Sequence, residues 1–321
     1  MSPSTRSDAV HVRAPGKINL GLVVGRRQED GFHPLATVFQ AVSAYEDVTA
    51  HPAESGVTVT VSGLHADRVP TGEQNLAVRA ARLLAESTGV EAAVRLHIRK
   101  GVPVAGGMAG GSADAAATLV ACDTLWRTGL SRDDLAELGA ALGSDVPFPL
   151  AGQTAIGRGR GDLLTPAMSR GEYHWALALQ DTGLSTPEVF GVFDELIAGA
   201  VVDDPQADRT LMQALRAGDA AELGRALRND LQPAALELAP HLAETLAVAQ
   251  DAGALGVVVS GSGPTVAALG RSRQHALAIA AAVTAAGVAD DVLCVTGPVA
   301  GARLSGGAEM LASAGTPGDR G

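Results

Sequence analysis

The chain has 321 residues, of which 46% are hydrophobic, and its 24 lysines and arginines against 35 aspartates and glutamates give a net charge of −11. No run of about eighteen uninterrupted apolar residues occurs, and no apolar segment follows the first charges, so we expect a cytoplasmic protein without a membrane span or secretory signal. The acidic charge and an aromatic content of 3% argue against nucleic acid as a partner, because such binders need basic surfaces and stacking platforms.

The first half of the chain mixes predicted strands and helices. Apolar and β-branched runs predict strands at 10–14, 18–24, 57–61 and 94–99. Asn75 is the expected N-cap of a helix that continues to Ala85. Ser112 is expected to open a second helix, apolar nearly all round and therefore buried. Ser131 and Asp134 form the pattern of a capping box before a third helix.

The second half repeats this mixture. Thr186-Pro187-Glu188 predicts a helix start, with a hydroxyl cap, a proline and an acid in the first turn. Further helices are expected at 208–217, 220–229, 236–251 and 273–286, and strands at 174–180, 256–260, 265–269 and 291–296. We expect one domain over 1–165, a second over 166–300 and a disordered tail over 301–321.

A loop rich in small residues joins the strand at 94–99 to the helix opened by Ser112. It comprises Pro103, Val104, Ala105, Gly106, Gly107, Met108, Ala109, Gly110, Gly111, Ser112 and Ala113. Such a loop lets backbone N–H groups converge on an anion at the positive end of a helix, and we expect Gly110 to touch phosphate. The Walker and dinucleotide-binding patterns are both missing. The alternative is a flexible turn.

Three other segments are candidates for chemistry, although each has an ordinary structural explanation. Lys17 and Asn19 fall on the same face of a strand, where a lysine is commonly just exposed. Asp145, in a small-residue turn, is able to deprotonate a hydroxyl group if it is buried beside a lysine, or it is a routine loop acid. The segment Ser260–Thr265 is a second glycine loop or a tight turn.

The order of these segments resembles the GHMP small-molecule kinases, over most of residues 10–296. The segments Ala14–Leu20, Arg27–Gln40 and Leu142–Phe148 are similar to signatures of one branch, whose substrate is a cytidine-diphosphate polyol. The resemblance implies a two-domain α+β fold with the active site in the inter-domain cleft. It also implies phosphorylation of a hydroxyl group by ATP, with Mg²⁺ held mainly through the nucleotide phosphates and no metal site made of protein ligands.

The resemblance implies roles for individual residues. Lys17 and Asp145 match the catalytic pair, and residues 103–113 match the loop that binds ATP. The substrate positions are Asn19, Phe32, His33, Thr186 and Phe190, with Phe32 and Phe190 on opposite faces of the cytosine. The chain departs from the family pattern at Phe32, where tyrosine is usual, and at Ala105, Ala109 and Ala113, where glycine or serine is common.

Two rival functions stay open from the sequence. One is another GHMP kinase, of the homoserine or mevalonate type, although those substrates carry no base for Phe32 and Phe190 to stack on. The other is a non-catalytic nucleotide-binding regulator on the same scaffold, which would not need both Lys17 and Asp145. The partners expected are small molecules, and the oligomeric state is left between a monomer and a weak dimer.

Overall fold

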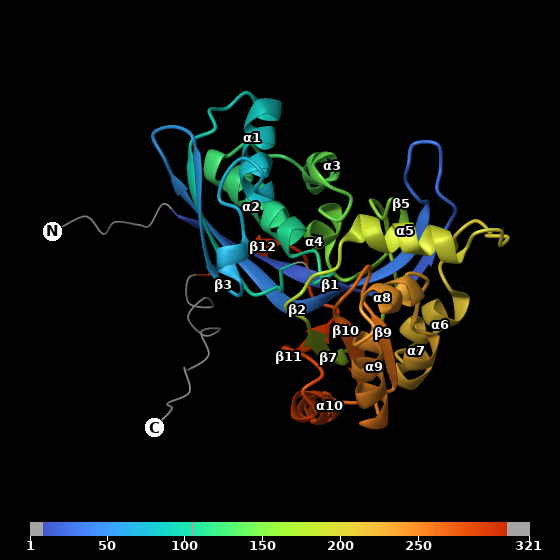
Figure 1. Cartoon of the computed structure of the whole chain (residues 1–321). Helices are drawn as coiled ribbons and strands as arrows, with labels where there is room; N and C mark the ends of the chain where they lie inside the picture. Colours follow the sequence, from blue (N-terminus) through green and yellow to red (C-terminus); the bar gives the residue numbers. More distant parts are fainter. Residues whose placement is uncertain (1–8, 105, 307–321) are drawn as a thin grey trace, which may run out of the picture.

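Two β-sheets organise the protein, as the computed structural model in Figure 1 shows for residues 9–104 and 106–306. The first sheet contains β1 (Val10–Val24), β2 (Leu35–Pro52), β3 (Val57–Gly63), β4 (Val94–Lys100), β5 (Thr154–Gly159), β6 (Leu163–Pro166), β8 (Arg228–Asn229) and β12 (Arg303–Leu304). Its main path runs β12-β1-β2-β4-β3, and the β5–β6 hairpin pairs with the other end of β2.

Helices from the first half cover one face of this sheet (Figure 1). They are α1 (Leu76–Thr88), α2 (Gly110–Trp126), α3 (Arg132–Leu142) and α4 (Pro147–Ala151), and a short 3-10 helix, η1 (Ala66–Arg68), precedes them. Helix α2 is buried almost all round, as its alanine-rich sequence predicts, and packs with α1 on the apolar face of β1, β2 and β4. This burial fixes the start of α2, and hence the glycine loop before it, against the sheet.

The second sheet runs β11-β7-β10-β9 and is antiparallel throughout. Its strands are β7 (Tyr173–Leu179), β9 (Gly256–Val259), β10 (Val266–Gly270) and β11 (Asp291–Gly297). The helices of this half are α5 (Thr186–Leu196), α6 (Arg209–Ala217), α7 (Ala220–Ala226), α8 (Gln232–Leu238), α9 (Leu242–Asp251) and α10 (Arg273–Ala286). One core cluster joins Ile18 and Val38 of the first sheet to Trp175 and Leu177 of the second. The two halves therefore share a core.

The strongest helix signals in the sequence are confirmed. The Asn75 side chain accepts a hydrogen bond from the Ala77 N–H at the start of α1. The capping box of Ser131 and Asp134 starts α3, and α10 has the predicted bounds. The α+β architecture is also confirmed.

Several boundaries differ from those predicted. The strands at 10–14 and 18–24 form one strand, β1, because register shifts near Pro15 and Gly21 let the chain continue past the proline. Helix α2 begins at Gly110 instead of Ser112, and α5 begins at Thr186 with Ser185, not Thr186, at its N-cap. The helix expected at 236–251 is two helices, α8 and α9, with Pro240 between them.

The division of the chain into 1–165 and 166–300 stays a prediction, but its C-terminal end needs correction. Arg303 and Leu304 form β12 and pair with Arg13 and Val12 of β1. Residues 301–306 therefore continue the folded chain where a tail was expected. The rest of that expected tail, 307–321, lies outside the described residues.

Candidate active site

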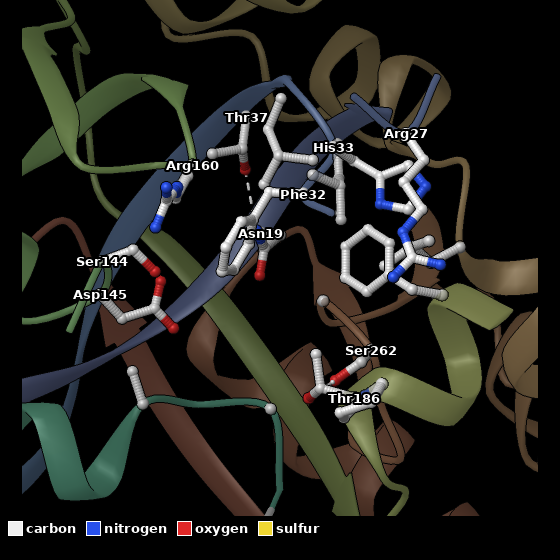
Figure 2. A pocket seen from close by; sticks show the side chains of 18 of the residues that line it. Asn19, Arg27, Phe32, His33, Thr37, Ser144, Asp145, Arg160, Thr186 and Ser262 are labelled. Carbon is white, nitrogen blue, oxygen red and sulfur yellow. Dashed lines mark hydrogen bonds between the residues drawn. The ribbon is translucent and has the colours of Figure 1, made fainter. Parts of the chain in front are cut away.

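A cavity of about 520 Å³ brings most of the predicted site together. Its walls include Lys17, Asn19, Phe32, His33, Gly107, Ala109, Asp145, Thr186 and Phe190. Figure 2 shows Asp145 and Ser144 near one end of the cavity in this view, and His33 and Arg27 near the other. Segments far apart in the sequence thus converge on a single space.

Lys17 is a buried ammonium on β1. Its Nζ donates a hydrogen bond to Asn19 Oδ1 (2.8 Å) and lies 5.3 Å from the centre of the Phe39 ring. Burial lowers the pKa of Lys17, and the charge of Asp145 acts in the opposite direction. Among the described residues Lys17 makes no direct ion pair with Asp145. The two groups face the same cavity and interact through space.

Asn19 ties the lysine to both halves of the chain. Its backbone N–H donates to Ser260 Oγ (3.3 Å), and its Nδ2 donates to Thr37 Oγ1 (2.8 Å; Figure 2). Thr37 Oγ1 in turn donates to the Gly21 carbonyl (2.9 Å). This network fixes the Asn19 side chain with its Oδ1 toward Lys17, so Asn19 positions the ammonium.

The glycine loop reaches the cavity through Gly107 and Ala109, just before the N-terminus of α2. Gly107 has φ +72°, and a Cβ there would lie 2.5 Å from the Ser260 carbonyl oxygen, so only glycine fits. Ala109 also has a left-handed conformation, with φ 58°, which residues other than glycine rarely adopt. The positive end of the α2 dipole therefore adjoins the cavity.

Most of the other loop residues predicted to bind ATP are buried or half-buried. The buried ones are Pro103, Gly106, Met108, Gly110 and Ala113, while Val104 and Ser112 are half-buried and Gly111 is exposed. A Cβ on Gly110 would lie 3.0 Å from Glu46 Oε1 and 3.4 Å from Val102 Cβ. The side of Gly110 on which a side chain would stand is therefore packed on the core, and contact of its backbone N–H with phosphate stays a prediction. Ala105 lies outside the described residues.

A buried charge cluster of Glu46, Lys100 and Asp114 packs against the glycine loop on the side of the core. Lys100 Nζ lies 2.7 Å from Glu46 Oε1 and 2.5 Å from Asp114 Oδ2, and Glu46 Oε2 accepts the Gly101 N–H (3.1 Å). Burial raises the pKa of Asp114 to about 6 and that of Glu46 well above its usual range. Burial lowers the pKa of Lys100, but the two carboxylates outweigh it and raise the pKa above 10.5.

Aromatic rings gather at the end of the cavity away from Asp145. The His33 ring stacks on Phe190 with centroids 4.8 Å apart, and its Nε2 lies 2.8 Å from Asp194 Oδ1. Phe32 is half exposed, and the Arg160 guanidinium lies 3.8 Å above its ring. Both phenylalanines line the cavity.

Thr186 lines the cavity at the start of α5, and its role in substrate binding stays a prediction. It is the first residue of α5, and its Oγ1 lies 2.9 Å from Ser262 Oγ, in hydrogen-bonding distance. Figure 2 shows this pair on the wall next to α5. The contact links the start of α5 to the Ser260–Thr265 loop, which places Phe190 one turn further along the helix.

Sequence reasoning missed several residues that line the cavity. Arg160 and Asp194 lie outside every segment singled out in the sequence, whereas Arg27, Thr37, Ser144 and Ser262 lie within such segments but had no assigned role. Arg160 lies in the β5–β6 hairpin, which was not predicted, and Asp194 lies on α5 one turn beyond Phe190. The helical spacing of Asp194 from Phe190 was the one available signal, because residues four apart share a helix face.

Two absences hold for the part of the chain that the structure describes. No group of three or more His, Cys, Asp or Glu side chains is arranged to hold a metal ion. None of the helices there has both the length and the apolar character that a membrane span requires.

Comparisons with known proteins agree with this geometry. Residues 75–153 match the GHMP kinases N terminal domain and residues 211–289 match the GHMP kinases C terminal family. The chain is 54% identical to a 4-diphosphocytidyl-2-C-methyl-D-erythritol kinase of Clavibacter michiganensis, over 94% of this chain and 98% of the relative.

Solved structures place the chain in the same group. A crystal structure of 4-(cytidine 5'-diphospho)-2C-methyl-D-erythritol kinase is 31% identical, with a TM-score of 0.74 over 92% of this chain and all of the other. A homoserine kinase from Cytophaga hutchinsonii has a TM-score of 0.71 over 95% of this chain and all of its own, but at 20% identity it shows the fold alone. The chain belongs to the 4-diphosphocytidyl-2-C-methyl-D-erythritol kinases, a branch of the GHMP kinase family.

Proposed function

We propose that the protein transfers the γ-phosphoryl group of ATP to the C2 hydroxyl of 4-diphosphocytidyl-2-C-methyl-D-erythritol, a step in the non-mevalonate route to isoprenoid precursors. The observation that carries the proposal is the single cavity that joins Lys17 and Asp145, at the end of a glycine loop, to an aromatic end containing Phe32 and Phe190. One end suits phosphoryl transfer and the other suits a nucleobase.

Asp145 is the group that receives the proton in this proposal. The hydroxyl oxygen attacks the γ-phosphorus, its O–H proton passes to the Asp145 carboxylate, and the bond from the γ-phosphorus to the bridging oxygen breaks to release ADP. Lys17 lies in the same cavity and offers a compact positive charge to the phosphoryl oxygens. The buried surroundings that lower its pKa also strengthen its interaction with an anion.

Mg²⁺ is expected to enter with the nucleotide. Gly107 and Ala109 line the cavity just before the N-terminus of α2, where the nucleotide phosphates that carry this ion would lie. The donor set therefore fits a cation carried mainly by ATP. When bound, the ion neutralises charge on the phosphoryl group being transferred.

The aromatic end supports a cytidine substrate over the rival kinases. A ring between Phe32 and Phe190 would stack on one or both faces, and homoserine and mevalonate have no ring to place there. The retention of Lys17 and Asp145 in one cavity supports an enzyme over a non-catalytic nucleotide regulator. We infer a cytoplasmic enzyme with small-molecule partners, as either a monomer or a weak dimer.

ADP release tests the proposal against its rivals. The purified protein with ATP and Mg²⁺ is offered 4-diphosphocytidyl-2-C-methyl-D-erythritol, homoserine and mevalonate in separate assays. Turnover of the cytidine compound alone is expected, and Asp145→Asn serves as the matched inactive control. Turnover of homoserine or mevalonate without the cytidine compound would refute the assignment, and binding of ATP without turnover of any of the three would favour a regulator.

A further inference from the structure

His33 is held in place from three sides at the aromatic end of the cavity. Its ring stacks on Phe190 (4.8 Å, 29° between planes) and meets the edge of Phe193 at 6.0 Å. Its Nε2 lies 2.8 Å from Asp194 Oδ1. The histidine is only 8% exposed, whereas the Asp194 side chain is 32% exposed and lines the cavity. Asp194 therefore contacts His33 and is also accessible to a ligand in the cavity.

The contact with Asp194 decides which groups His33 can offer. A carboxylate accepts hydrogen bonds and donates none, so a proton must lie on His33 Nε2. In a neutral imidazole the other nitrogen, Nδ1, is then an acceptor. The carboxylate of Asp194 therefore presents an acceptor at this end of the cavity, and its contact with Nε2 fixes the orientation of His33.

Acceptors distinguish two pyrimidines that have almost the same shape. Cytosine carries an amino group at position 4, which donates hydrogen bonds, and carboxylates accept from that group. Uracil carries a carbonyl oxygen there, which would face a carboxylate with no proton between them. A site with buried acceptors rejects a ligand that leaves them unpaired.

We infer that Asp194 is the residue that sets the preference for cytosine over uracil, through the carboxylate that it presents to position 4 of the base. Asp194 is a positioning and specificity residue that contacts His33, which lies at the end of the cavity opposite Asp145 in Figure 2, so it affects recognition of the base and not the transfer of phosphate. The inference rests on the proposed function, because it presumes that the base of the substrate occupies the aromatic end. It adds a residue on α5 that none of the motifs in the sequence contains.

Asp194→Asn tests this inference with little change in shape. The variant keeps an oxygen for His33 Nε2–H and gains an amide donor that suits the uracil carbonyl. The substrate and its uridine analogue, with the same diphosphate and polyol, are compared by steady-state kinetics. Glu195→Gln is the matched control, because Glu195 is exposed on the same helix, is not part of the cavity wall, and loses the same charge.

The expected result is a weaker preference for the cytidine compound over the uridine compound, with the rate of phosphoryl transfer little changed. The wild type and Glu195→Gln should prefer the cytidine compound, and Asp194→Asn should lower the ratio of the two kcat/KM values by about tenfold to a hundredfold, as expected for hydrogen bonds to a charged group. The change should fall on KM, with kcat for the cytidine compound within about threefold, since the groups at the reacting end are untouched. Asp194→Ser, which removes the charge with less volume, should lower the ratio in the same way.

Other outcomes separate the inference from the function on which it rests. An unchanged ratio in both Asp194 variants would overturn the inference, as would equal use of the two compounds by the wild type. A lower ratio produced equally by Glu195→Gln would also overturn it, because the effect would then be one of net charge. If the wild type turns over neither compound, it is the proposed function that fails.

Discussion

Removing the buried ammonium of Lys100 should destabilise the whole fold. In Lys100→Met the side chain keeps its length and apolar stem but loses the charge that lies between Glu46 and Asp114. Both carboxyl groups are almost fully buried, and Asp114 Oδ1 already has no hydrogen-bond partner among the described residues. The variant therefore leaves two uncompensated acids in the core beneath the glycine loop.

The size of this effect follows from the burial. Removing one partner of a buried ion pair costs about 3–5 kcal/mol. Unfolding of a 321-residue chain carries an entropy of about 0.7 kcal/mol/K, so the Tm should fall by about 4–7 °C. Differential scanning calorimetry at pH 7.5 measures it. The double variant Lys100→Met/Asp114→Asn should recover part of the loss, because it removes one of the two uncompensated charges.

The loss should also depend on pH, with a defined sign. The pKa of Asp114 is raised to about 6 and that of Glu46 is raised well above its usual range, so the folded state binds more protons than the unfolded chain above about pH 4. Stability from these groups is complete in acid and declines as the pH rises through about 6. Without Lys100 both carboxyls become harder to ionise, so the variant should approach the wild type at pH 5 and differ most above pH 7. A Tm within 1 °C of the wild type at pH 7.5, or a larger deficit at pH 5, would refute this account of the cluster.

Other predictions concern the cavity and its loop. Asp145→Asn should lower kcat by about 10²–10⁴-fold, with the KM values for ATP and for the cytidine substrate within a few-fold of the wild type. Steady-state kinetics that show more than about a tenth of wild-type kcat would contradict the proton-acceptor role. Phe32→Ala should raise KM for the cytidine substrate about five- to a hundredfold and leave KM for ATP unchanged, because the ring lost is on the base side; equal changes in both would argue against this. Because burial lowers the pKa of Lys17, kcat/KM should decline on the alkaline side before pH 10.5, and a profile flat to that pH would show that its charge is not needed. Gly110→Val should lower the Tm by crowding Glu46 and Val102. Gly111→Ala should not, because a Cβ there would lie 3.6 Å from Leu76 Cδ1, an ordinary van der Waals distance; equal Tm values would place Gly110 away from the core.

Local signals in the sequence were sufficient for much of the fold. Asn75, Ser131 and the bounds of α10 depend on hydrogen bonds within one turn, and the structure has all three. The largest omission was β2, which spans 18 residues. Its two faces are both buried over most of its length, since α2 covers one and the second half of the chain approaches the other, so the alternation typical of a half-exposed strand is missing.

The candidate site was predictable where a motif carried the chemistry. Lys17, Asp145 and His33 lie in distinctive segments and line one cavity. Asp194 and Arg160 do not, because an acid on a helix and an arginine in a hairpin are common anywhere on a surface. Asp194 reaches the cavity because α5 packs beside β1, and Arg160 reaches it because the β5–β6 hairpin pairs with β2. The composition of the glycine loop indicated that its backbone lies close to other atoms. It did not indicate whether those atoms belong to a ligand or, as at Gly110, to the protein core.

The Ser260–Thr265 loop gives the protein a mechanical coupling between its halves. It receives the Asn19 N–H at Ser260, meets Gly107 at the Ser260 carbonyl and contacts Thr186 through Ser262. A ligand in the cavity contacts residues from both halves of the chain, so its binding stabilises the contact between the two halves. At a ligand concentration of 100 Kd, binding adds about 2.7 kcal/mol to the free energy of unfolding. Both halves gain this stability, because unfolding of either half would remove part of the binding site. Saturating substrate should therefore raise the temperature of the melting transition of the whole protein.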